Sequence, residues 1–151
     1  MRVYLDTCCY NRPFDKSQEK SVHNESNAII AIFYMAAKNY ITILGSDILR
    51  QEIGAVKDSE KKIKLSDLYT SFLREEIHYR DNIEIRAKFF MTEANIKTMD
   101  AFHIAYAEAG EVDYFLTTDY RLIKSCEKLA LNFKVVNPVV FSLKIGGLEH
   151  D

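Results

Sequence analysis

The sequence has no excess of charge of either sign. Its 20 lysine and arginine residues are balanced by 22 aspartate and glutamate residues, so the formal net charge is −2. A chain with this charge has no bulk electrostatic attraction for nucleic acid, and any affinity for a polyanion must be local or come from a bound metal ion. The composition by itself therefore gives no indication of a nucleic-acid-binding protein.

Cysteine and long hydrophobic runs are scarce as well. The three cysteines, of which Cys8 and Cys9 are adjacent, are an odd number without metal-ligand spacing. This favours reduced thiols over disulfides and argues against a zinc site. The apolar run after Met1 is too short for a signal peptide, and no stretch approaches the roughly 20 apolar residues of a membrane span. We therefore expect a soluble, cytoplasmic protein.

Linkers, internal repeats and low-complexity segments are also missing. With 151 residues, of which 48% are hydrophobic, the chain is long enough to bury the core of one domain without disulfides or a structural metal. We predict a single domain over residues 1–145 and a loose C-terminal tail over residues 146–151.

Short apolar runs alternate with helical periodicities along the chain. Residues 3–5 form a continuous apolar run that ends at Asp6, which is typical of a buried parallel strand. Ser46 and Thr98 are the expected caps of the helices that follow them. The alternation predicts an α/β fold with a central, mostly parallel sheet covered on both faces. The other elements that we expect are a long helix ending near residue 38, strands over 40–44, 114–117 and 134–136, and helices over 47–56, 58–77, 83–94, 98–109 and 122–131.

Two carboxylates stand where predicted strands stop. Asp6 follows the first strand and Asp119 follows the strand over 114–117. In open α/β sheets the ligand crevice lies outside the carboxyl ends of the strands, so both acids are expected at one rim. Each acid could equally do no more than cap the turn or helix that follows its strand.

Two further acids lie on predicted helices that face the sheet. Glu52 shares an apolar stripe with Ile48 and Val56, so we expect its carboxylate to point inward, where an unpaired charge costs several kcal/mol. A structural ion pair with a basic side chain is the alternative. Asp100 lies in the first turn of its helix, where the macrodipole alone would stabilise it. That helix is apolar nearly all round, however, which favours an orientation toward the same rim.

Four carboxylates at one rim repel one another unless a cation compensates them. Oxygen ligands alone favour a hard cation, so the pattern indicates Mg²⁺ or Mn²⁺. Thr7 and Thr118, beside Asp6 and Asp119, are candidates to orient these acids through hydroxyl hydrogen bonds, although they can equally satisfy nearby backbone groups.

The order and spacing of these segments resemble the PIN-domain family along nearly the whole chain. The matching segments are Val-Tyr-Leu-Asp6-Thr, Ser46-Asp-Ile-Leu-Arg-Gln-Glu52, Asp100-Ala-Phe-His-Ile-Ala and Leu-Thr-Thr-Asp119. The resemblance implies a three-layer α/β/α sandwich, with Asp6, Glu52, Asp100 and Asp119 as metal-binding acids. It also implies a Mg²⁺- or Mn²⁺-dependent cut in single-stranded or loop RNA.

The short chain looks most like the VapC-type toxins of that family, which are ribonucleases silenced by an antitoxin. This implies an antitoxin partner and a homodimer. One departure concerns Tyr120 and Arg121, which occupy a stretch where many relatives carry a further acid. The number of metal ions, one or two, therefore stays open.

Other residues have weaker functional interpretations. Arg12 could reach a phosphate and Tyr10 could stack on an unpaired base, or both could be ordinary loop residues. His103 is expected to be a hydrogen-bonded core histidine. A group of lysines, Lys57, Lys61, Lys62 and Lys64, is expected to be a solvated helix face. The main alternative function is a catalytically silent PIN-like module that binds RNA or protein. A phosphatase-type domain fits less well, because Cys8 stands where such enzymes commonly carry a second aspartate.

Overall fold

Within residues 1–146, five strands form one sheet in which all neighbours are parallel, in the order β3-β2-β1-β4-β5. The computed structural model describes residues 1–146. The first strand of the chain, β1, is central, as its continuous apolar run predicts. The strands are β1 (Arg2–Leu5), β2 (Thr42–Ser46), β3 (Leu73–Ile77), β4 (Tyr114–Leu116) and β5 (Lys134–Val136).

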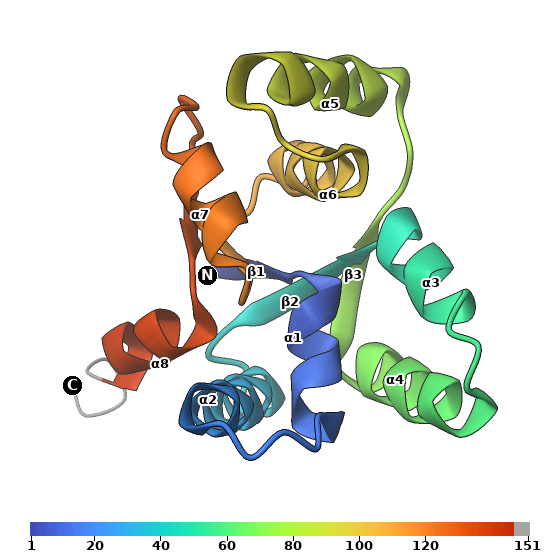
Figure 1. The fold of residues 1–151 in the computed structure, drawn as a ribbon, viewed down its shortest axis with the longest axis vertical. Helices are drawn as coiled ribbons and strands as arrows, with labels where there is room; N and C mark the ends of the chain where they lie inside the picture. The colour runs from blue at the N-terminus through green and yellow to red at the C-terminus, as the bar shows by residue number, and fades with distance from the viewer. Residues whose placement is uncertain (147–151) are drawn as a thin grey trace.

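Helices cover both faces of this sheet. Figure 1 shows α6 on one face with α5 outside it, and α1, α2, α4 and α8 on the opposite face. This arrangement confirms the expected three-layer α/β/α sandwich. The helices are α1 (Thr7–Asn11), a 3-10 turn (Arg12–Phe14), α2 (Lys20–Ala37), α3 (Asp47–Gly54), α4 (Ser59–Phe72), α5 (Asp81–Ala94), α6 (Thr98–Ala109), α7 (Tyr120–Cys126) and α8 (Pro138–Gly146).

The centre of the core is β1 itself. Val3, Tyr4 and Leu5 are fully buried, because β1 pairs with β2 on one side and β4 on the other and carries helices on both faces. Leu5 lies beside Leu116 of β4, and the backbone N–H of Asp6 donates to the carbonyl of Leu116 at 2.9 Å. The carboxyl ends of β1 and β4 therefore meet at one edge of the sheet.

The prediction of one helix over residues 58–77 is wrong. Helix α4 ends at Phe72, and residues 73–77 form the edge strand β3, which pairs with β2. Two polar contacts stabilise this strand: the Arg2 guanidinium binds Glu75 at 2.8 Å from a distant part of the chain, and the Tyr69 hydroxyl of α4 donates to Glu76 at 2.7 Å. The helical spacing of apolar residues continued through Ile77 because an apolar side chain there is buried in either conformation.

Several element boundaries also differ from the prediction. Helix α7 ends at Cys126, and α8 was not predicted at all. Lys97 caps α6 with its backbone, so Thr98 is its first residue and not its cap. Ser46 does cap α3, by accepting from the N–H of Leu49 at 3.2 Å.

The expected C-terminal tail, the absence of a membrane span and the reduced cysteines can be compared with the structure over residues 1–146. Gly146 is the last residue of α8, and the rest of the predicted loose tail lies outside the described residues. None of the helices within residues 1–146 has both the length and the apolarity to cross a membrane. The cysteines Cys8, Cys9 and Cys126 are free, as expected.

Candidate active site

The two acids at the strand ends lie on neighbouring strands, and each also caps a helix. The Asp6 carboxylate accepts from the N–H of Thr7 at 2.8 Å at the start of α1. The Asp119 carboxylate accepts from the N–H groups of Arg121 and Leu122 at the start of α7, through Oδ1 in both cases. Capping and a metal-binding role are therefore compatible here, because Oδ2 of Asp119 is left for another ligand.

Thr117 connects these two acids. Its buried hydroxyl donates to Oδ2 of Asp6 at 3.0 Å and accepts from the backbone N–H of Asp119 at 3.1 Å. Thr118 is the residue expected to make such a contact, but its hydroxyl accepts from Arg12 at 2.9 Å instead. The signal that distinguishes the two threonines is strand alternation, because only one of two neighbours can face the sheet edge beside Asp6.

Glu52 comes from α3 and is held through one of its two oxygens. Thr7, which we expected to orient Asp6 through its hydroxyl, instead donates that hydroxyl to Oε1 of Glu52 at 3.0 Å, and Nε2 of His103 contacts the same oxygen. Burial alone would raise the pKa of Glu52, but the hydrogen bonds from His103 and Thr7 bring that pKa below its ordinary value. Since both contacts use Oε1, Oε2 of Glu52 is left for a cation.

His103 is the buried, hydrogen-bonded histidine that the sequence predicts, but its connections reach the candidate site. Its Nδ1 lies 2.7 Å from the Tyr4 hydroxyl, which lies 2.7 Å from the Ser46 hydroxyl. All three side chains are buried. Burial lowers the pKa of His103, but the hydrogen bond with Glu52 and the nearby carboxylates outweigh burial and raise that pKa above its ordinary value. Nδ1 donates to the Tyr4 hydroxyl when His103 is protonated and accepts from it when His103 is neutral, so the chain of contacts is satisfied in both states. Sequence reasoning missed this role, because the partners of His103 come from other segments.

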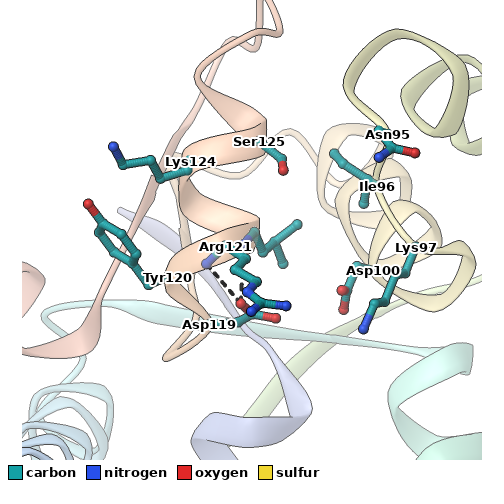
Figure 2. A pocket seen from close by; sticks show the side chains of 10 residues that line it. Asn95, Ile96, Lys97, Asp100, Asp119, Tyr120, Arg121, Lys124 and Ser125 are labelled. Atoms are coloured by element: carbon teal, nitrogen blue, oxygen red, sulfur yellow. Dashed lines mark hydrogen bonds between the residues drawn. The ribbon is translucent and has the colours of Figure 1, made fainter.

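The electrostatics of Asp100 indicate that the four acids share one neighbourhood. Its pKa is raised to about 6, first by burial and then by the charges of Asp6 and Asp119, with a further contribution from Glu52. Figure 2 shows Asp100 on α6 and Asp119 before α7 pointing toward one another. A carboxylate in this situation is stabilised by a cation rather than by its protein neighbours.

A second group of possible ligands lies elsewhere. Of the side chains in residues 1–146, those of Asp47, Glu76 and His78 have ligand atoms that all lie within 4.8 Å of one another, whereas the four predicted acids are not drawn together as tightly. The two acids of this second group already have partners within the protein. His78 binds Asp47 at 2.9 Å, and the Arg50 guanidinium donates to Glu76 at 2.9 Å. The four predicted acids, which lack comparable compensation at Asp100, fit a hard divalent cation better.

The two residues predicted to contact RNA, Tyr10 and Arg12, are poorly placed to do so. Tyr10 is fully buried, and its ring packs against Phe33 and Tyr69 with centroids 5.8 and 5.6 Å apart. The prediction that Tyr10 stacks on a base is therefore wrong, because its ring belongs to the core. Arg12 lies 3.0 Å from Asp15 and 3.2 Å from Glu25, so most of its charge is compensated within the protein.

A cleft opens beside Asp100 and Asp119, between the segment before α6 and the start of α7 (Figure 2). It encloses about 480 Å³. Besides the two acids, it is lined by Asn95, Ile96, Lys97, Tyr120, Arg121, Leu122, Lys124 and Ser125.

No family model matches the sequence, and no curated protein matches it either. Solved structures do match. The chain is similar to one in the crystal structure of VapBC2 from Rickettsia felis bound to a DNA fragment from their promoter, with 20% identity over 91% of this chain and 98% of the other and a TM-score of 0.59. It is also similar to one in FitAcB from Neisseria gonorrhoeae, with 14% identity over 90% and 97% and a TM-score of 0.57. The chain therefore has the fold of the VapC-like PIN-domain proteins, as its sequence motifs suggested.

Proposed function

We propose that the protein is an endoribonuclease that depends on Mg²⁺ or Mn²⁺, with Asp6, Glu52, Asp100 and Asp119 as the metal-binding acids. The observation that carries this proposal is the pKa of Asp100, which is raised to about 6 by burial and by the charges of the other three acids. Such a concentration of negative charge at the ligand-binding edge of an α/β sheet is costly without a cation. The fold shared with VapC-like PIN domains supports the same conclusion.

Neighbouring side chains orient the carboxylates of two of the acids through hydrogen bonds. Thr117 holds Asp6, and Thr7 and His103 hold Oε1 of Glu52. When bound, a divalent cation lowers the pKa of a coordinated water and offsets charge on the phosphodiester oxygens. Asp100 must be ionised to bind it, and its raised pKa makes binding weaken as the pH falls toward 6.

We further propose that the protein is the toxin of a toxin–antitoxin pair and that it forms a homodimer. The support is the shared fold with a chain of VapBC2 and a chain of FitAcB, together with the sequence motifs. An antitoxin that blocks the acidic edge of the sheet would silence the enzyme.

Sequencing the ends of RNA fragments tests the proposal. Purified protein is incubated with an RNA pool in Mn²⁺, with and without a chelator, beside Asp100→Asn and the matched control Asp67→Asn. Asp67 is an exposed acid on α4. We expect wild type and Asp67→Asn to produce the same new ends, and neither the chelated sample nor Asp100→Asn to do so. Cleavage that survives both changes would point to another mechanism. No cleavage by any sample would favour a catalytically silent binding module.

A further inference from the structure

The cleft beside Asp100 and Asp119 carries basic side chains on both of its walls. Lys97 precedes α6 and Arg121 lies in the first turn of α7. Figure 2 shows Lys97 beside Asp100 and Arg121 beside Asp119, so a cation and an acid stand together on each wall. Both basic side chains are exposed.

The charges of these two cations are available to a ligand. Every ion pair among the described residues engages other basic side chains. Neither cation stabilises a local turn, because Lys97 caps α6 without its side chain and Arg121 contacts Asp119 through its backbone.

An exposed aromatic ring lies at the flank of the cleft, on the side of α7 turned away from Lys97 (Figure 2). Tyr120, between Asp119 and Arg121, is 67% exposed, and the Lys124 ammonium lies 5.5 Å from the centre of its ring. An exposed ring next to cations is the combination that holds an unpaired base and its phosphate in proteins that bind single strands. Tyr10 is buried in the core and cannot stack on a base, whereas the exposed ring of Tyr120 can.

We infer that this cleft binds the phosphate backbone of single-stranded RNA, with Lys97 and Arg121 on phosphates next to the cleaved bond and Tyr120 stacked on a base. This inference rests on the proposed function and names the residues that hold its substrate. The net charge of −2 gives no overall attraction for RNA, so local cations beside the acids have to supply it. An acidic protein segment is the competing ligand, but an exposed aromatic ring suits a base better than a carboxylate.

The test is the salt dependence of RNA binding. A fluorescein-labelled, ten-nucleotide RNA of mixed sequence is titrated with protein in Ca²⁺, and fluorescence anisotropy gives the affinity at several salt concentrations. The variant Lys97→Gln/Arg121→Gln is compared with Lys61→Gln/Lys64→Gln, which removes the same charge from the exposed face of α4. We expect the first variant to bind on the order of tenfold more weakly and its slope against log salt to fall by about 1.4, or about 0.7 per phosphate contact.

The stacking role of Tyr120 is tested in the same assay. Tyr120→Ala should weaken binding roughly fivefold or more, while Tyr120→Phe, which keeps the ring, should bind like wild type. Equal affinities for the two variants would overturn the assignment of the base to Tyr120.

The remaining outcomes separate this inference from the proposed function. Wild type that cuts RNA in Mn²⁺, together with unchanged binding and salt slope in Lys97→Gln/Arg121→Gln, would overturn the inference and leave the nuclease intact. If only Lys61→Gln/Lys64→Gln loses affinity, the inference is also overturned, because RNA would then bind along α4 and not in the cleft. If Lys97→Gln/Arg121→Gln loses binding to a labelled polyglutamate peptide but binds RNA like wild type, the ligand of the cleft is an acidic protein segment instead.

Discussion

The Tyr4 hydroxyl lies 2.7 Å from Nδ1 of His103 inside the core, and the opposite nitrogen of the same ring contacts Glu52. This contact connects the central strand to one of the four candidate metal ligands. A side chain in the middle of β1 thereby influences the orientation of a carboxylate on α3. Polar groups this deeply buried are costly to leave without partners, so the chain of contacts is a sensitive place for substitution.

We predict that Tyr4→Phe lowers the free energy of unfolding by about 1–3 kcal/mol, because it leaves the buried groups of Ser46 and His103 without their shared partner. Urea denaturation monitored by circular dichroism measures this change. Tyr34→Phe, at a ring that is 58% exposed, is the control and should change stability little. Equal stabilities of the two variants would contradict the hydrogen-bonded chain.

We predict that His103→Leu weakens Mn²⁺ binding, because Glu52 loses the hydrogen bond that orients its carboxylate. Loss of a group that orients a metal ligand typically lowers affinity about 10–100-fold, and calorimetric titration of Mn²⁺ measures it. His103→Gln keeps an N–H donor that can reach Glu52, so we expect it to recover much of the affinity. If both variants bind Mn²⁺ like wild type, His103 only packs in the core.

The pKa of Asp100 predicts how stability depends on pH in the absence of metal. The folded protein holds the Asp100 proton up to about pH 6, against an ordinary value of 3.8. The unfolded chain therefore binds fewer protons between these values, and the contribution of Asp100 to stability falls as the pH rises through this window. Asp100→Asn removes this loss, so the variant should match wild type below pH 4.

Above pH 6, metal-free Asp100→Asn should be more stable than wild type by on the order of 1 kcal/mol, after a discount for solvent screening. Thermal unfolding in a chelator at several pH values measures the difference. Adding Mg²⁺ should then stabilise wild type and not the variant. If the stability difference between wild type and Asp100→Asn does not change with pH, the pKa of Asp100 is not raised by the other three carboxylates.

Gly45 allows Tyr69 to approach the end of β2. A Cβ atom at Gly45 would lie 2.1 Å from the Tyr69 hydroxyl and 2.6 Å from a methyl of Leu73. We predict that Gly45→Ala costs about 1–3 kcal/mol of stability by overpacking. Gly54→Ala, at the end of α3 with nothing within 4 Å of the new Cβ, should be neutral or stabilising by up to about 1 kcal/mol. Similar effects of the two substitutions in urea denaturation would contradict this packing.

Local sequence predicted the elements that carry the candidate site. Asp6 and Asp119 follow buried apolar runs, and burial of such runs in a parallel sheet depends little on distant detail. The failure at β3 has the opposite cause. Residues 73–77 are mostly charged, and their strand is stabilised by a contact that local sequence does not show, that of Arg2 with Glu75. Tyr69 of α4 adds a nearer contact with Glu76.

The contacts around the acids were less accessible from sequence. Thr7 follows Asp6, which we expected it to orient, but its hydroxyl reaches Glu52 on a distant segment. Thr117 and Thr118 are neighbours that only strand alternation distinguishes. His103 reads as a core histidine because its spacing shows the buried face of α6 and not the partners at its two nitrogens. Tyr10 was misplaced for a related reason: the turn after β1 is a short helix that turns the ring inward.

Anomalous scattering from a crystal soaked in Mn²⁺ locates the bound metal and so shows whether the four acids hold it. We expect an anomalous peak bounded by Asp6, Glu52, Asp100 and Asp119, and its loss in Asp100→Asn crystals. A peak at Asp47, Glu76 and His78 instead, or none at the four acids in metal-saturated crystals, would contradict it.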